Sequence, residues 1–157
     1  MALRYLLDTN ICIYIAKKRP AEVLARFRQL RPGEVAMSVI THGELYFGAC
    51  KSSRRDEAEK ALDDLAIMVP VLPLVPEVGK RYGEIRSTLE RSGSLIGNND
   101  LWIAAHAIAL GVPLVTNNDR EFRRVLGLEV HNWAVKKPEA RPQVHETARK
   151  YRARRRR

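Results

Sequence analysis

The sequence is poor in the features that mark secreted and membrane-spanning proteins. Only two of its 157 residues are cysteine, Cys12 and Cys50, and both lie in apolar helical contexts. We therefore expect small core residues in a reducing compartment rather than a disulfide or metal ligands. No apolar run approaches the roughly 20 residues of a membrane span, and the N-terminus lacks the layout of a signal peptide. These absences predict a soluble, cytoplasmic protein that has no membrane partner.

Two other absences limit the kinds of functional site that the sequence can be expected to form. The chain contains no internal repeat and no glycine-rich phosphate-binding loop. Its histidines show no metal-ligand spacing; they are His42, His106, His131 and His145. Zinc is accordingly disfavoured, and we interpret these histidines as surface or helix residues rather than catalytic ones.

Positive charge is concentrated at one end of the chain. The net charge is +10, but the first 133 residues carry only +2, and residues 134–157 carry ten Lys and Arg against two acids. This end has no apolar periodicity, so it cannot bury enough surface to offset its ordering entropy. We predict one folded domain over residues 1–133, within the usual domain size, and a basic, disordered or weakly helical tail over 134–157. Such a tail indicates an anionic partner, although it could also serve only solubility.

A buried helix followed at once by a strand lies near the middle of the chain. The run from Leu101 to Leu110 is apolar almost all round, which is typical of a buried helix. Asn98 or Asn99 is expected to cap its start, and Gly111 its end. The strand Pro113–Thr116 follows, as in one half of a parallel α/β unit.

The other segments alternate in the same way. Strands are predicted at Leu3–Leu7, Glu34–Val39 and Leu128–Trp133, with an edge or irregular strand at Val69–Val75. Helices are predicted at Ile11–Ala16, Pro20–Leu30, Ser52–Ile67, Pro76–Arg91 and Arg120–Leu126, and another is capped by Ser38 or Thr41. This order predicts an α/β fold with a mostly parallel central sheet and helices on both faces.

Acidic residues follow the strands of this predicted sheet. Asp8 ends the first strand, Glu44 lies near the start of the helix after the second, Asp100 opens the buried helix, and Asp119 follows Thr116. Taken singly, Asp100 could complement a helix dipole and Asp119 could form a turn or cap. Ligands of open α/β sheets, however, bind outside the carboxyl ends of the strands, where these acids would converge.

Four carboxylates at one sheet edge repel one another unless a cation lies between them. Magnesium prefers hard oxygen ligands, keeps several waters and works with a few carboxylates plus a substrate phosphate. We therefore expect a Mg²⁺ site, with Asp8 and Asp100 as primary ligands and Glu44 and Asp119 completing the site or orienting water.

The motifs around these acids resemble those of PIN-domain ribonucleases, and most closely the VapC toxins of bacterial toxin–antitoxin pairs. They are LLDTN at Leu6–Asn10, Glu44, ND-x-x-IAAHA at Asn99–Ala107 and LVTNN-x-x-EF at Leu114–Phe122. The resemblance covers about Leu3 to Trp133. It implies a PIN-like three-layer sandwich whose matching acids bind Mg²⁺ or Mn²⁺ and cleave single-stranded or looped RNA.

The resemblance also implies partners and a further site residue. Thr116 matches a family position that supports the acids or orients water, so it joins the candidate catalytic residues. A homodimer and a cognate antitoxin that blocks the groove are implied as well. For the tail the family gives no guidance; by charge, we expect its terminal arginines to bind RNA phosphates, namely Arg152, Arg154, Arg155, Arg156 and Arg157.

Two other classes of function remain open on sequence alone. A different Mg²⁺ phosphoryl-transfer domain would also place acids at strand ends, but a phosphatase would want an Asp where Asn10 stands, and a receiver-like domain a Lys that Val130–Trp133 lacks. A non-catalytic nucleic-acid binder that acts through its tail would not need the four acids.

Overall fold

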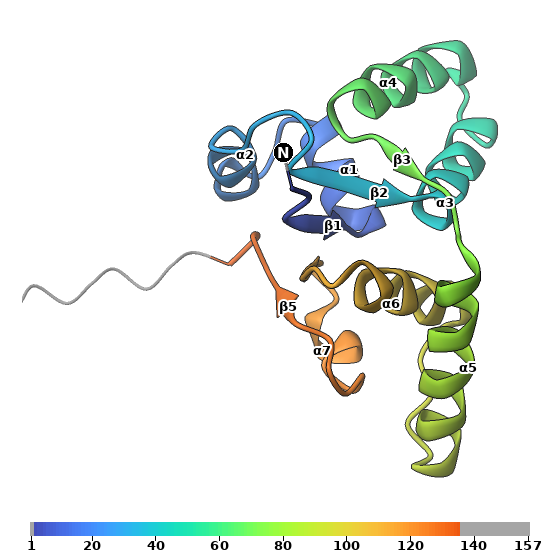
Figure 1. Cartoon of the computed structure of the whole chain (residues 1–157). Helices are drawn as coiled ribbons and strands as arrows, with labels where there is room; N and C mark the ends of the chain where they lie inside the picture. Colours follow the sequence, from blue (N-terminus) through green and yellow to red (C-terminus); the bar gives the residue numbers. More distant parts are fainter. Residues whose placement is uncertain (1, 136–157) are drawn as a thin grey trace, which may run out of the picture.

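Five short strands form the centre of the computed structural model, which describes residues 2–135 (Figure 1). The sheet order is β3-β2-β1-β4-β5, and every neighbouring pair is parallel. The strands are β1 (Tyr5–Leu7), β2 (Val35–Ser38), β3 (Val71–Leu72), β4 (Leu114–Val115) and β5 (Val130–His131). The predicted α/β class is confirmed, with a sheet that is wholly rather than mostly parallel. Strand β3 lies at its edge, as the flanking Pro70 and Pro73 indicate.

Seven helices connect and cover the strands within the described part of the chain. They are α1 (Thr9–Ala16), α2 (Ala21–Phe27), α3 (Val39–Cys50), α4 (Arg55–Met68), α5 (Pro76–Arg91), α6 (Asn98–Leu110) and α7 (Asp119–Phe122). The predicted bounds of α5 are met, and Ser38 rather than Thr41 caps α3. The predicted helix Arg120–Leu126 is wrong in length: beyond Phe122 the chain continues in tight turns, with Val125 N bonded to Phe122 O at 3.0 Å.

The two faces of the sheet are covered by different helices. Leu6 and Leu114, which pair across β1 and β4, face a core built with α5, α6 and α7. The next residues along these strands, Leu7 and Val115, face a second core built with α1, α2 and α4. Because successive strand residues point to opposite faces, the apolar run at each strand is buried on both sides. The result is a three-layer sandwich, in which α5 runs beside α6 on the opposite side from α2 (Figure 1).

Helix α6 is buried as predicted, but its start differs from the prediction. Ile103 and four neighbouring small or apolar residues are buried against the sheet and α5, and Gly111 ends the helix with φ of 67°. Neither Asn98 nor Asn99 is the N-cap. Gly97 occupies that position without a side-chain hydrogen bond, since both asparagines make contacts with other helices instead.

The cysteines divide between the interior and the surface. Cys12 is buried in the core around α1, as predicted, whereas Cys50, the last residue of α3, is exposed. The prediction of a core role is therefore wrong for Cys50. None of the helices formed by residues 2–135 is both long and apolar enough to cross a membrane.

The predicted tail, residues 134–157, lies outside the described residues apart from Ala134 and Val135. The predicted boundary at residue 133 therefore stays a prediction. Trp133 itself belongs to the folded part: its side chain is buried and meets the ring of Tyr5 edge-on, with the ring centres 5.4 Å apart.

Candidate active site

Asp8 occupies the turn between β1 and α1 and is almost fully buried, with 4% of its surface exposed. Its two carboxylate oxygens accept hydrogen bonds from Thr9 N at 2.8 Å and Thr116 Oγ1 at 2.7 Å. Burial raises the pKa of Asp8 above its ordinary value; the two hydrogen bonds oppose this effect, and the nearby charge of Glu44 adds to it. The carboxylate is thus held in place but costly to ionise, which a bound cation would relieve.

Thr116 follows β4 and supports Asp8. Its buried hydroxyl donates to Asp8 and accepts from Asn118 N at 2.9 Å. One hydroxyl can serve both contacts because it is a donor and an acceptor at once. Thr116 therefore connects the loop after β4 to the acid after β1, which agrees with the supporting role expected for it.

Glu44 reaches the same region from α3. Its carboxylate accepts hydrogen bonds from Thr9 Oγ1 on one oxygen and from Asn99 Nδ2, at 3.1 Å, on the other. These donors belong to the first turns of α1 and α6. Glu44 is thereby tied to the elements that carry Asp8 and Asp100.

Asp100, in the first turn of α6, is the most strongly perturbed acid of this region. Its pKa is raised to about 7, first by burial and then by the charges of Asp8, Glu121 and Glu44. Burial and the neighbouring carboxylates thus make the ionised form of Asp100 costly when no cation is bound. Carboxylates that crowd one another in this way are what a cation stabilises.

Glu121 is the member of this cluster that the sequence prediction missed. It lies on α7, two residues after the predicted Asp119. On a helix, residues two positions apart project in nearly opposite directions, and Glu121, not Asp119, is among the charges that raise the pKa of Asp100. The signal in the sequence was present, since Glu121 lies within the quoted run Leu114–Phe122, but the order of the strands does not distinguish the two acids.

Asp119 makes different contacts from those predicted. One oxygen accepts from Asn132 Nδ2 at 2.9 Å, and the other lies 3.3 Å from Arg123 Nη2. Neither contact joins Asp119 to Asp8, Glu44 or Asp100. Of the predicted acids, the structure therefore brings Asp8, Glu44 and Asp100 together and adds Glu121, and it pairs Asp119 with a cation and an amide.

We name Asp8, Glu44, Asp100 and Glu121 the acid cluster. Within residues 2–135, no three His, Cys, Asp or Glu side chains are arranged to enclose an ion by themselves. Magnesium does not need such a cage, since it usually keeps several waters and binds through one or two carboxylates and a substrate phosphate. The oxygen-only donors and the raised pKa values of Asp8 and Asp100 fit such an ion.

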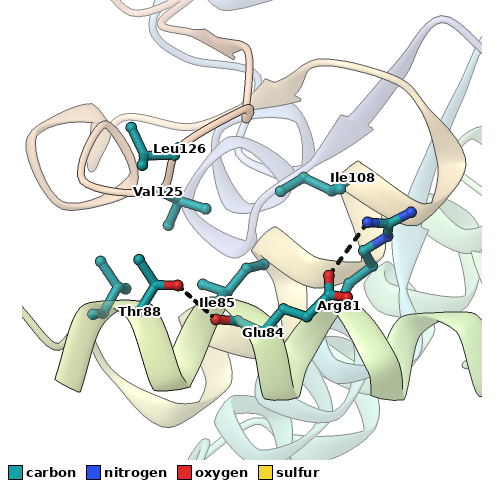
Figure 2. A pocket seen from close by; sticks show the side chains of 8 residues that line it. Arg81, Glu84, Ile85, Thr88, Ile108, Val125 and Leu126 are labelled. Carbon is teal, nitrogen blue, oxygen red and sulfur yellow. Dashed lines mark hydrogen bonds and ion pairs between the residues drawn. The ribbon is translucent and has the colours of Figure 1, made fainter. Parts of the chain in front are cut away.

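A small cavity lies elsewhere on the molecule. It measures about 180 Å³ and lies between α5, the second half of α6 and the turns after α7. Figure 2 shows Ile85, Ile108 and Val125 around it, with Arg81 and Glu84 paired along α5. No member of the acid cluster lines this cavity, so the acids form a separate site.

Comparison with known proteins identifies the family. The PIN domain family model matches residues 5–128. The chain is also 44% identical over 131 residues to ribonuclease VapC2 of Haemophilus influenzae, a match that covers 83% of this chain and 98% of that protein. The chain belongs to the PIN-domain family. Within that family its relatives are VapC ribonucleases, so the resemblance read from the motifs is confirmed.

Two further comparisons support this assignment. The tRNA(fMet)-specific endonuclease VapC of Shigella flexneri is 39% identical to this PIN domain over 84% of the chain and 99% of that protein. The structure of VapBC-1 from nontypeable Haemophilus influenzae has a chain that is 40% identical, with a TM-score of 0.79, over 85% of this chain and all of that one. Because the chain belongs to the PIN-domain family, the receiver-like and phosphatase-like alternatives are excluded.

Proposed function

We propose that this protein is the ribonuclease toxin of a toxin–antitoxin pair and that it hydrolyses RNA phosphodiester bonds in a Mg²⁺- or Mn²⁺-dependent reaction. One observation carries the proposal: a VapC-like chain places Asp8, Glu44, Asp100 and Glu121 together, with the pKa of Asp100 raised to about 7. A bound ion would provide a nucleophile from water and neutralise charge on the scissile phosphate.

The residues of the chain have separate tasks in this proposal. Asp8 and Asp100 hold the ion, and Asp8 is kept in position by Thr116 and Thr9. Glu44 and Glu121 complete the site or orient water. The sequence assigned the last task to Asp119; its pairing with Arg123 and Asn132 supports giving that task to Glu121.

We propose single-stranded or looped RNA as the substrate. The name of the Shigella flexneri relative specifies tRNA(fMet), so an initiator tRNA is the first substrate to test. The test compares cleavage of that tRNA, an unstructured RNA and a duplex RNA, with Mg²⁺ or with a chelator. We expect cuts in the first two with Mg²⁺ only, and 5′-phosphate ends. Cleavage that persists in the chelator would contradict metal dependence.

A protein partner is part of the same proposal. Related chains have been solved as VapBC complexes, and we infer that a cognate antitoxin covers the acid cluster, with an Arg directed to the acids. Expression of the protein alone should arrest growth, and co-expression with the antitoxin should restore it. Asp100→Asn should remove the toxicity without the antitoxin.

We also propose a homodimer. The apolar faces of α4 and α5 pack inside the monomer through Leu62, Leu65 and Ile85. Exposed apolar side chains lie on α3, where Tyr46 and Phe47 are 41% and 61% exposed, and at the end of α4, where Ile67 is 80% exposed. Exposed aromatic side chains of this kind are common at interfaces. Sedimentation at micromolar concentration should give twice the chain mass of 17.9 kDa; a species of single mass would contradict the dimer.

The tail arginines, Arg152, Arg154, Arg155, Arg156 and Arg157, lie outside the described residues. From their charge we propose that they bind RNA phosphates without sequence preference. A chain that ends after Val135, which keeps the buried Trp133, should retain its turnover at saturating RNA and bind RNA more weakly. A plot of the logarithm of its RNA affinity against the logarithm of the salt concentration should be less steep than that of the full chain, by about 0.7 for each phosphate contact removed. An unchanged slope would contradict this role.

A further inference from the structure

The two asparagines at the start of α6 reach sideways to different helices. Asn98 Oδ1 accepts a hydrogen bond from Tyr82 OH of α5 at 2.6 Å, and Asn99 Nδ2 donates to Glu44 Oε1 of α3 at 3.1 Å. Gly97 caps the helix, so neither amide is used for capping. Asn99 is therefore free to act on the acid cluster, although it lies on the surface.

Glu44 is the acid that most needs such support. Asp8 and Asp100 have short side chains on a strand end and a helix start, whereas Glu44 has one more rotatable bond and comes from a third element. Its carboxylate is fixed only if both oxygens find donors. Thr9 Oγ1 supplies one and Asn99 Nδ2 the other. A carboxylate that is oriented beforehand loses less conformational entropy when it binds a ligand.

We infer that Asn99 is a positioning residue for Glu44 and that Thr9 assists it from the other side. This inference rests on the proposed function, because it assumes that Glu44 acts in the metal-dependent site. Hydrogen-bond partners that orient ligating carboxylates typically contribute about 10- to 100-fold to metal affinity. Asn99 therefore acts on metal binding through Glu44 and not as an ion ligand itself.

The residue type at position 99 follows from the contact. An amide presents N–H groups to the carboxylate, whereas Asp at the same position would present a further negative charge to Glu44. Asn99→Ala removes the donor and Asn99→Asp reverses its effect. Asn99→Ala is therefore the variant that tests the donor alone, because Asn99→Asp would also add a negative charge that attracts the cation.

The experiment measures Mn²⁺ binding directly, by the electron paramagnetic resonance signal of the free ion, on the full chain without RNA. The variants are Asn99→Ala, Thr9→Val, Glu44→Gln and the double variant Glu44→Gln/Asn99→Ala. Asn98→Ala is the matched control, because it removes a neighbouring surface amide that bonds to Tyr82 instead of Glu44. Thermal unfolding in a chelator verifies that each variant is folded.

We expect Asn99→Ala and Thr9→Val each to weaken Mn²⁺ binding about tenfold. The unfolding midpoint of Asn99→Ala should be unchanged, and Asn98→Ala should bind Mn²⁺ like the wild type. In the Glu44→Gln background, Asn99→Ala should have no further effect. Cleavage assays should show a higher Mn²⁺ requirement and an unchanged RNA KM.

Three results would overturn the inference. If Glu44→Gln weakens binding but Asn99→Ala does not, the positioning role fails and the proposed function stands. If Asn99→Ala weakens binding equally in the Glu44→Gln background, Asn99 acts independently of Glu44. If Glu44→Gln itself binds Mn²⁺ like the wild type, the place of Glu44 in the proposed function fails together with the inference.

Discussion

Asp100 and Asp119 have the same side chain and lie in the first turns of two helices near the same sheet edge, yet their surroundings are opposite. Asp100 meets three other carboxylates, and its pKa is raised to about 7. Asp119 meets the guanidinium of Arg123 and the amide of Asn132. The charge of Asp119 is compensated within the chain, whereas the charge of Asp100 is not.

This difference separates a site from a structural contact. An acid whose partners within the chain are cations and amides contributes to the fold, whereas an acid surrounded by acids is costly unless an external cation arrives. Asn132 also bonds to the side chain of Asn117, so it connects the loop after β4 with the segment after β5. We name Asp119, Asn117 and Asn132 the amide clasp. Variants of the acid cluster should thus affect catalysis, and variants of the clasp should affect stability.

The largest effect is expected at the acid cluster. Asp8→Asn or Asp100→Asn should lower RNA cleavage by about a thousandfold or more with the fold retained, because losing an ion ligand raises the barrier by several kcal/mol and each ~1.4 kcal/mol is tenfold in rate. Single-turnover cleavage measures the loss. His42→Ala on α3 is the control and should remain active; His106 is unsuitable because it is buried and bonded to Ser38 at 2.9 Å. A variant that cleaves like the wild type refutes the site.

Substitutions on α7 test most directly whether Glu121 or Asp119 belongs to the metal site. Glu121→Gln should reduce cleavage by about 10- to 100-fold, since it removes a carboxylate whose charge acts on Asp100. Asp119→Asn should change cleavage by less than about threefold, because Asn can still accept from Asn132 and loses only a partly exposed ion pair with Arg123. Parallel kcat/KM measurements decide between them. The opposite ranking would restore Asp119 to the metal site, as the sequence predicted.

A moderate effect on stability is expected at the clasp. Asn132→Ala removes the hydrogen bonds to Asp119 and Asn117 and the one its Oδ1 accepts from Ala134 N at 2.9 Å. The free energy of unfolding should fall by about 1–2 kcal/mol, since each such bond contributes about 0.5–1.5 kcal/mol and the site is partly exposed. Urea denaturation measures it. Unchanged stability combined with lost metal binding would place Asn132 in the site.

The smallest effect concerns the pH dependence of stability without metal. The folded-state pKa of Asp100, about 7, lies above the ordinary aspartate value of 3.8. The folded state therefore loses stability as pH rises from about 4 to 7, and the loss is complete above 7. Asp100→Asn should therefore be more stable than the wild type at pH 8, by ~1 kcal/mol after discounting for partial exposure, and less so at pH 5. Denaturation in a chelator at both pH values tests this; an equal difference at both would contradict it. Saturating Mg²⁺ should stabilise the wild type only.

Local patterns in the sequence were sufficient for much of the architecture. Short apolar runs separated by amphipathic segments predicted a parallel sheet covered on both faces, and α5 begins and ends at the predicted residues because Pro76 starts it and its apolar spacing is strongly helical. The positions of Asp8 and Asp100 also followed, since parallel strands end at a shared edge and their carboxyl ends collect the residues that come after them.

Contacts between distant segments settle what the local pattern leaves open. Asp119 and Glu121 are equally acidic and almost adjacent, and which one faces Asp100 depends on the rotation of α7, which is held by Asn132 from beyond β5. Similarly, the local sequence predicts Asn99 as a helix cap, but in the structure Asn99 bonds to Glu44 of α3, which lies 55 positions away in the sequence. In both cases the packing of the sheet and its helices brings the partner close. The free energy of this packing comes from contacts between segments, so it cannot be read from any single segment.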